Sequence, residues 1–532
     1  MSTGLNGPAG ALSDALADSL SVALAADLAA ADADLAERFL GPPATRQPVH
    51  TLYLPAERVH ADVVAEVGAA ALEAFDAHLP DAAALVTVFG DVMFGDVVFA
   101  DVVRGDVRSG GPGIGGDDDE ARTHSEAAAL HALVRGKLER EPVEDLRIDF
   151  EDGFTQRGVP AGDLDRDEDA HVDRVLADLL TSHAAAAGRG PTSSSSLSSS
   201  LSSSTSSSLP PFWGLRFGSL DPATRRRGIR TFTRFVSGLA AGGGLPGSVP
   251  GGLPGSVRGD VLSHFRPTLP KVTSVDQVRA MVRMCRDLEQ TCGLAERSIG
   301  FEIQIETPQS ICGPDGSALV ARLVHASDRR CIGLHYGTYD YSAACGIAAE
   351  YQAMDHPAAD HAKSVMQVAA AGTGVALSDG STNQLPVGDR ADVHEAWRLH
   401  ARLVDRSLRR GFYQGWDLHP AQLVSRYVAT YAFYRRSLPA ACARIAAYLG
   451  TTPSRAPVAA GYLDEPATAR ALADFCLRAL DCGATTTGEV AQLAGVDRAT
   501  LDRLRRPGTG QGCNNDQAHH CEHVPDSAET TA

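Results

Sequence analysis

Charged side chains recur at the ends of short apolar segments, where their types could support metal and carboxylate chemistry. In chain order they are Asp149, Glu151, Asp152, Arg216, Lys271, Glu306, Asp340 and Asp379. Carboxylate and water oxygens suit Mg²⁺ or Mn²⁺, and the planar guanidinium of Arg216 suits a carboxylate on a substrate. If these residues meet in space, they predict a divalent-cation site with positions left open for a chelating substrate.

The apolar segments that would position these residues have the β-branched and aromatic content of buried strands. They span residues 50–55, 146–153, 212–219, 265–272, 299–308, 331–341, 374–380 and 411–420, with amphipathic stretches such as 275–290 and 393–410 between them. Successive strand ends at Lys271, Glu306, Asp340 and Asp379 are 35, 34 and 39 residues apart. A strand-plus-helix unit needs roughly 30 or more residues. The pattern predicts an α/β fold, a (β/α)₈ barrel whose working face lies at the carboxyl ends of the strands.

The rest of the chain is expected to extend or interrupt this barrel. We expect an N-terminal helical segment over 1–47, the barrel over 48–430, a helical region over 431–506 and a disordered tail over 507–532. Low-complexity inserts are expected at about 104–120, 187–210 and 240–260. Residues 90–107 are interpreted as an extra hairpin or an irregular insertion. Residues 485–506 resemble a helix-turn-helix, but we interpret them as a helical hairpin that packs on the barrel or on a partner subunit.

Charge and composition exclude several classes of protein. The 532 residues carry 48 Lys and Arg against 66 Asp and Glu, a net charge of −18. Nucleic acid and anionic membranes repel such a chain, so neither is an expected partner. The 10 cysteines include no CxxC pair, and no run of about 20 apolar residues occurs. We therefore expect a cytoplasmic protein with reduced thiols.

Six motifs in order carry a resemblance to a known family. They are DFEDG (149–153), LRFGS (215–219), LPKV (269–272), IQIETP (303–308), GTYDYSAACG (337–346) and GWDLHPAQL (415–423). The set resembles the HpcH/HpaI aldolase and citrate lyase β-subunit family of the phosphoenolpyruvate/pyruvate barrel superfamily, and within it an aldolase-like bacterial branch. Two departures stand out. LRFGS lacks the Asn that usually follows the Arg, and GWD replaces the usual GK, which puts an acyl-CoA substrate in doubt.

The resemblance implies roles for several residues and a chemistry for the site. Glu306 and Asp340 would bind Mg²⁺ (or Mn²⁺), and Arg216 would hold the substrate carboxylate or an enolate oxygen. Glu151 and Asp152 would organise metal-bound water, with Asp149 and Lys271 close to them. In relatives the C-terminal helical region covers a neighbouring subunit's active site, so a homo-oligomer is expected.

These roles predict a metal-dependent carbon–carbon lyase or aldolase that acts on an α-keto acid or a 2-hydroxyacyl derivative through an Mg-stabilised enolate. The candidates for the proton-transferring group are Asp379, Asp417, His335 and water held by the acids after the second strand. One alternative is a phosphoenolpyruvate- or pyruvate-utilising phosphotransferase or hydrolase on the same barrel. Another is a non-catalytic regulatory or binding protein that retains the barrel.

Overall fold

The computed structural model describes residues 8–43, 45–94, 117–156, 158–187, 209–242, 264–450 and 465–506. The chain divides into two compact units. The first comprises Met1–Val98 and Arg108–Arg436, and the second comprises Phe99–Val107 and Ser437–Ala532. All eight expected strands lie in the first unit, so this unit positions the candidate site.

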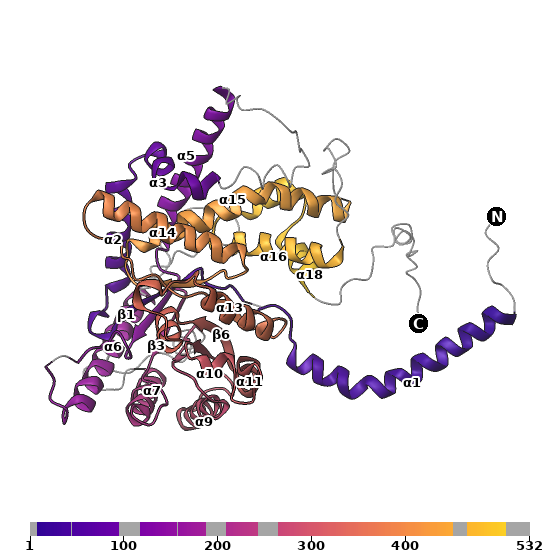
Figure 1. Cartoon of the computed structure of the whole chain (residues 1–532), viewed down its shortest axis with the longest axis horizontal. Coiled ribbons are helices and arrows are strands. Elements are labelled where there is room, and N and C mark those ends of the chain that lie inside the picture. Colours follow the sequence, from indigo (N-terminus) through magenta and orange to yellow (C-terminus); the bar gives the residue numbers. More distant parts are fainter. Residues whose placement is uncertain are drawn as a thin grey trace, which may run out of the picture. The chain divides into compact units, whose positions relative to one another are not determined.

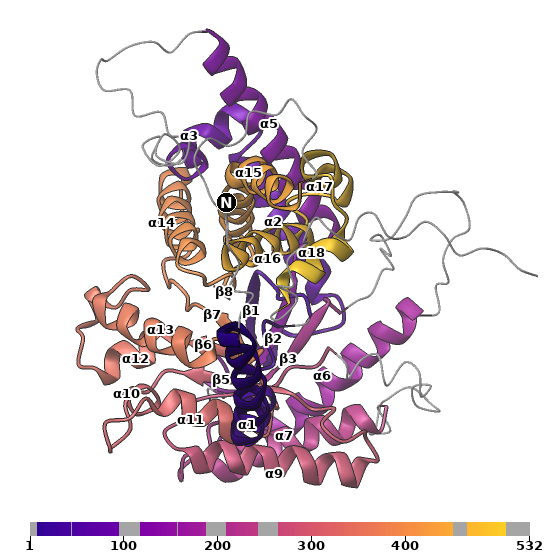
Figure 2. The same cartoon turned by 90° about the vertical axis from the view of Figure 1, so that its right-hand side faces the viewer.

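Eight parallel strands form one nearly closed barrel, which confirms the predicted (β/α)₈ fold (Figures 1 and 2). They are β1 (His50–Pro55), β2 (Asp145–Asp149), β3 (Phe212–Arg216), β4 (Thr268–Leu269), β5 (Phe301–Ile305), β6 (Cys331–Tyr336), β7 (Ala376–Ser378) and β8 (Gly415–Asp417). The order is β7-β6-β5-β4-β3-β2-β1-β8. A parallel bridge between Ser378 and Gln414 joins the two end strands, and the N–H of Asp379 donates to the Gln414 carbonyl at 2.8 Å. Seven strands fall within the segments expected from the sequence, and β2 begins one residue before its expected segment 146–153.

From β1 onward, helices alternate with the strands and most of them lie around the barrel, whereas the N-terminal helix α1 extends away from it (Figures 1 and 2). The first unit contains α1 (Pro8–Arg38), η1 (Ala56–Arg58), α2 (Val63–His78), α3 (Ala82–Phe94), α5 (Asp117–Arg140), α6 (Leu164–Ala187), α7 (Arg225–Ala240), α9 (Val275–Cys292), α10 (Pro308–Ile311), α11 (Leu319–Ala326), α12 (Thr338–Ala344), η2 (Ala349–Tyr351), α13 (Pro357–Ala370) and α14 (Arg390–Arg409). Local sequence explains their ends. For example, Ser274 and Gln277 form a capping box at the start of α9, and Gly293 ends that helix at φ 64°.

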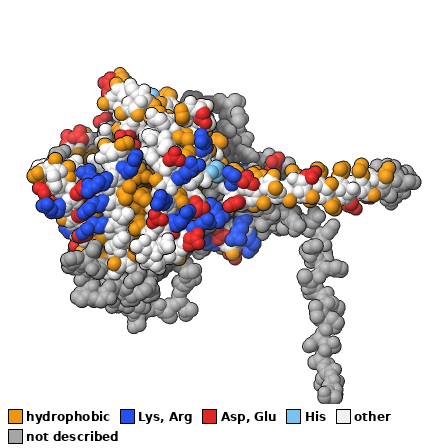
Figure 3. Space-filling model, turned by 90° about the horizontal axis from the view of Figure 1, so that it is seen from below, with side chains coloured by type: hydrophobic (Ala, Val, Ile, Leu, Met, Phe, Trp, Pro, Cys, Tyr) orange, Lys and Arg blue, Asp and Glu red, His pale blue; other side chains and the backbone are white. Residues whose placement is uncertain are grey.

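Two neighbouring helices show how the surface charges are arranged. Arg230 and Arg234 of α7 pair with Asp169 and Asp173 of α6. The face seen in Figure 3 likewise carries basic and acidic side chains side by side. In the described part of the chain, no single helix is long and apolar enough to span a membrane. Taken together, α2 and α3 have the length and apolar composition of a membrane-spanning segment, but the chain bends by 99° between them.

The region between β1 and β2 differs from its prediction. Residues 90–94 belong to α3, so the expected hairpin is wrong there, and residues 95–107 lie outside the described residues. Residues 117–120, expected to be insert, begin α5. Most residues of the other expected inserts lie outside the described residues, and so does the tail 507–532.

The second unit is helical. It contains the C-terminal part of α15 (Gln422–Leu449), from Ser437 onward. The other helices of this unit are α16 (Pro466–Cys482), α17 (Thr487–Ala494) and α18 (Arg498–Arg505). Val490, Ala494 and Leu501 are buried in one apolar cluster with residues of α15 and α16, including Ile445 and Leu477. Through these side chains, α17 and α18 pack on α15 and α16 within their own unit.

Candidate active site

On β2 and β5, polar side chains alternate with aliphatic ones and point into the barrel. On β2, Asp145 and Arg147 are fully buried, and the Arg147 guanidinium lies 2.9 Å from Glu302 of β5, a strand that is not adjacent to β2. Such a contact can only cross the barrel interior. Because side chains alternate along a strand, Asp149 continues this inward row, and so do Gln304 and Glu306 after Glu302.

Asp149 and Arg216 form the first pair at the carboxyl ends of the strands. The Nε and Nη2 atoms of Arg216 donate to the two Asp149 oxygens at 2.8 and 2.6 Å. Asp149 also accepts from the backbone N–H groups of Glu151 and Gly153. Both charged side chains are buried, and the Tyr53 ring lies 5.1 Å from the guanidinium. One edge of the Arg216 fork is thus occupied by Asp149, and Nη1 faces Glu151 at 3.5 Å.

Glu306 lies directly after β5 and is 1% exposed. Its Oε1 accepts the backbone N–H of Lys271 at 2.7 Å, and its Oε2 accepts from the Gln304 amide at 2.7 Å. Burial, followed by the like charge of Asp340, raises the pKa of Glu306 to about 8. A Cβ on Gly337 would lie 2.4 Å from the Glu306 Cβ. Only glycine therefore leaves room for this carboxyl group.

Lys271 joins the acids that follow neighbouring strands. Its Nζ lies 2.7 Å from Glu151, 2.6 Å from Asp152 and 3.8 Å from Asp340. Its backbone is in the left-handed region, at φ 50°. Burial raises the pKa of Glu151 to about 7, although Arg216 and Lys271 oppose this shift. Burial also raises the pKa of Asp340. For Asp152, hydrogen bonds from Glu151 and Lys271 and the charge of Arg216 outweigh burial and lower the pKa.

The structure thus brings together seven of the residues predicted from the sequence. They are Asp149, Glu151, Asp152, Arg216, Lys271, Glu306 and Asp340. Among the described residues, no three His, Cys, Asp or Glu side chains are grouped as a complete metal-binding set. Two carboxylates with several waters are nevertheless a normal way for a protein to hold Mg²⁺. The donor set of Glu306 and Asp340, in a cluster with more carboxylates than cations, fits a divalent cation.

Asp379 and Asp417 do not reach this cluster. Asp379 pairs with Lys363 of α13 at 2.8 Å and accepts from Ser407 of α14 at 2.6 Å. Asp417 pairs with Arg426 of α15 at 2.8 Å. Both aspartates are buried against the surrounding helices, so the catalytic roles predicted for them conflict with their positions.

His335 is engaged inside the barrel, where the Trp416 indole N–H lies 3.1 Å from its Nδ1 and Glu302 lies 3.2 Å from its Nε2. Two residues that contact the cluster were missed by the sequence reasoning, namely Gln304 and Tyr53. Gln304 precedes Glu306 by two residues, and Tyr53 lies on β1. The alternation of polar and aliphatic residues along β5 was the signal that could have identified Gln304.

Fold and site together define a (β/α)₈ barrel with an acidic, cation-suited cluster at the carboxyl ends of its strands. The chain belongs to the family described as a domain of unknown function, DUF6986, whose model matches residues 28–508. A comparison with curated proteins found no match. Membership of the aldolase and citrate lyase family stays a prediction from the motifs.

This chain is similar to a number of solved structures, among them the following three proteins. A citrate lyase from Burkholderia xenovorans LB400 is 20% identical, with a TM-score of 0.43 over 73% of this chain and 98% of that one. Haloferax volcanii malate synthase, in a pyruvate/acetyl-CoA ternary complex, is 15% identical (TM-score 0.35; 59% and 66% covered). Mycobacterium tuberculosis CitE, in complex with magnesium and acetoacetate, is 14% identical (TM-score 0.34; 82% and 98% covered). At such low similarity these likenesses assign no activity to this chain.

Proposed function

We propose that the chain is a divalent-metal-dependent carbon–carbon lyase or aldolase that acts on an α-keto acid or a 2-hydroxyacyl derivative. The observation that carries this proposal is the convergence of Glu306, Asp340, Arg216 and Lys271 at one end of the barrel. Carboxylates outnumber cations in this cluster, and burial, together with the charge of neighbouring carboxylates, raises the pKa values of Glu306 and Asp340. A bound Mg²⁺ or Mn²⁺ would offset that excess.

Glu306 and Asp340 are the residues that would hold the metal. Bound there, the metal would supply Lewis-acid stabilisation of negative charge on an enolate oxygen. Gln304 and the Lys271 N–H fix the Glu306 carboxyl group from both sides, so its orientation is set before any ligand arrives. Such preorganisation lowers the reorganisation cost of catalysis.

Arg216 is the group proposed to contact the substrate. Asp149 holds its Nε and Nη2, which leaves Nη1 to donate to a substrate carboxylate or to a developing oxyanion. A buried guanidinium interacts more strongly with such a charge than an exposed one, because the local dielectric constant is lower. Asp149 is thus proposed as the positioning residue for Arg216.

Glu151 is the proposed proton carrier. The other candidate side chains pair with residues outside the cluster; they are Asp379, Asp417 and His335. Glu151 lies within reach of Lys271 and Arg216, and its pKa of about 7 suits a group that accepts and returns a proton near neutral pH. It could act directly or through a water that it shares with Asp152.

A metal-dependent activity screen tests the proposal. Candidate substrates are oxaloacetate, 4-hydroxy-2-keto acids, and malyl- or citramalyl-CoA, assayed with Mg²⁺, with Mn²⁺ and with EDTA. We expect Glu306→Gln and Asp340→Asn each to lower turnover by about 10²–10³-fold and to weaken metal binding in calorimetry. Asp276→Asn is the matched control, because that side chain is 84% exposed on α9.

Two results would count against the proposal. One is the absence of metal binding to the wild-type chain. The other is full activity in both Glu306→Gln and Asp340→Asn, which would place the chemistry elsewhere. Ultracentrifugation of the same samples tests the further prediction of a homo-oligomer.

A further inference from the structure

Two aromatic side chains support Arg216 from inside the barrel. The ring of Tyr53 on β1 lies 5.1 Å from the Arg216 guanidinium, and the ring centroids of Tyr53 and of Trp416, on the neighbouring strand β8, are 4.6 Å apart. Both aromatic side chains are buried. Tyr53 pairs with Arg147 in the strand register, which places it two residues nearer the amino ends of the strands than Arg216. The two rings therefore form a layer beneath the candidate site.

Polar contacts in the barrel interior hold the second ring of this layer in place. An indole nitrogen can only donate a hydrogen bond, so the Trp416 N–H donates to His335 Nδ1, at 3.1 Å. His335 Nε2 lies 3.2 Å from Glu302, and Glu302 lies 2.9 Å from Arg147. All of these side chains are buried. Contacts thus run without a break from the buried ion pair through Trp416 to the Tyr53 ring.

Asp149 by itself leaves the Arg216 guanidinium one freedom of movement. It accepts from Nε and Nη2, so the two planar groups are held edge to edge, but they can still tilt together about the line of their bonds. A ring packed against the guanidinium restricts this tilt, and the attraction between a cation and an aromatic ring is strongest where both are desolvated. The Tyr53 hydroxyl has no hydrogen-bond partner among the described residues. The ring of Tyr53, and not its hydroxyl, is therefore the part that acts on Arg216.

We propose that Tyr53 and Trp416 are positioning residues, which fix the orientation in which Arg216 presents its Nη1 to the carboxylate of an α-keto acid. This role rests on the proposed function and adds a requirement to it, namely that affinity for the substrate carboxylate depends on the aromatic layer. Arg216 would hold that carboxylate in the ground state as well as in the transition state. Loss of its support should therefore raise KM more than it lowers kcat. Trp416 acts through Tyr53, so its anchor to His335 should matter less than the Tyr53 ring itself.

Substitutions of Tyr53 test this role in the full chain. The measurements are calorimetric titration with pyruvate at saturating Mg²⁺, and KM and kcat for the substrate that the wild type turns over fastest in the metal-dependent screen. Tyr53→Leu keeps an apolar side chain but removes the ring, and we expect it to raise Kd and KM about five- to thirtyfold, with kcat within about threefold of the wild type. Tyr53→Phe keeps the ring, so both constants should stay within about twofold of the wild type.

A second variant tests the contribution of Trp416. Trp416→Phe keeps an aromatic ring but loses the N–H that donates to His335, so we expect Kd and KM to rise about two- to fivefold. Because Trp416 acts through Tyr53, Trp416→Phe should add little when Tyr53→Leu is already present. If the effects of the two substitutions simply multiply, the two rings act independently and the proposed order of contacts is wrong.

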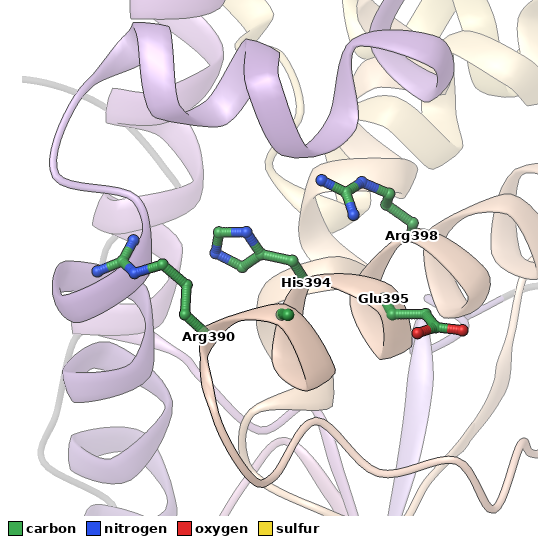
Figure 4. Close-up of a pocket in the computed structure, with 5 residues that line it drawn as sticks. Arg390, His394, Glu395 and Arg398 are labelled. Atoms are coloured by element: carbon green, nitrogen blue, oxygen red, sulfur yellow. The ribbon is translucent and has the colours of Figure 1, made fainter.

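The matched control is Phe89→Leu, which removes a buried ring from α3. Phe89 stacks on Trp397 of α14, and so does His394, which Figure 4 shows in a surface pocket along that helix. This variant should lower the Tm, as Tyr53→Leu does, and leave Kd and KM unchanged.

Three results would overturn the role of Tyr53. They are unchanged Kd and KM in Tyr53→Leu, an equal loss of affinity in Phe89→Leu, and a loss in Tyr53→Phe as large as that in Tyr53→Leu. A wild-type chain that neither binds pyruvate nor turns over any substrate of the screen would instead show that the proposed function is wrong, and the role of Tyr53 would fall with it.

Discussion

Replacing Asp417 with asparagine is expected to weaken the fold and to spare the chemistry. Asp417 is fully buried, and its Oδ1 lies 2.8 Å from Arg426 Nη2 and 3.2 Å from His400 Nε2. Its Oδ2 accepts from Arg426 Nε at 3.2 Å. Burial alone would raise the pKa of Asp417, but Arg426 and His400 lower it below its usual value. The group is thus a permanently ionised structural anion.

The size of the effect follows from this geometry. Breaking a buried ion pair by removing one partner costs about 3–5 kcal/mol, because the remaining charge stays buried without compensation. Asparagine keeps the shape and one acceptor oxygen, so we expect a loss near 3 kcal/mol. Urea unfolding should show a lower midpoint with an unchanged slope. Turnover of the folded fraction, measured well below the new Tm, should stay within about threefold of the wild type.

Comparison variants separate a structural role from a catalytic one. Arg426→Gln should destabilise the chain by a similar amount, and the double variant should lose less than the sum of the two singles, because the pair interacts directly. Asp340→Asn is the functional counterpart, since its side chain is 44% exposed and its loss should affect turnover rather than stability. The reasoning is refuted if Asp417→Asn keeps the wild-type urea midpoint and loses turnover a hundredfold.

Three further predictions concern crowding and pH. Gly337→Ala would place a Cβ 2.4 Å from that of Glu306, so metal affinity should fall about 10–100-fold in calorimetry; unchanged affinity would contradict the assigned site. Gly214→Ala would place a Cβ 2.0 Å from the Arg266 carbonyl oxygen, so it should lower the free energy of unfolding by about 3 kcal/mol in urea. A wild-type urea midpoint would show instead that the backbone can shift there at little cost. Burial lowers the pKa of His50 to about 4 from an ordinary 6.5. Between these two pH values, His50 is therefore protonated in the unfolded chain and neutral in the folded chain. Stability should therefore fall by up to about 3 kcal/mol as the pH drops from 6.5 to 4, and His50→Gln should flatten that dependence in urea unfolding at pH 7, 6 and 5.

The barrel could be predicted from the sequence because its signal is local and repeated. The strands lie in short segments with many β-branched and aromatic residues, and each interval is long enough for one crossover helix. The interval between β1 and β2 was harder. Residues 90–107 contain many valines and several phenylalanines and suggest strands. Residues 90–94 nevertheless continue α3, where Val92 and Met93 are buried. Tertiary packing there outweighs the intrinsic β-propensity.

Asp417 shows why the candidate site was only partly predictable. Its position at a strand end suggested the barrel rim, but successive residues of a strand face opposite sides. Trp416 points inward to His335, so Asp417 must face the helices, where Arg426 and His400 lie on α15 and α14. The alternation of side chains could have revealed this orientation, whereas the partners that hold Asp417 depend on helix packing that sequence spacing does not provide.

The same alternation explains how the acidic cluster is held in place. Asp149 lies two residues after Arg147, and Glu306 lies four after Glu302, so each belongs to the inward-facing row of its strand. The residues between them, such as Ile148 and Ile305, are fully buried and face the surrounding helices. A slip of one residue would turn these isoleucines inward and the carboxylates outward against apolar helix faces, at a cost of several kcal/mol for each unpaired buried charge. Apolar packing on the outside of the barrel therefore fixes the register that places the carboxylates together, although those side chains never touch the cluster.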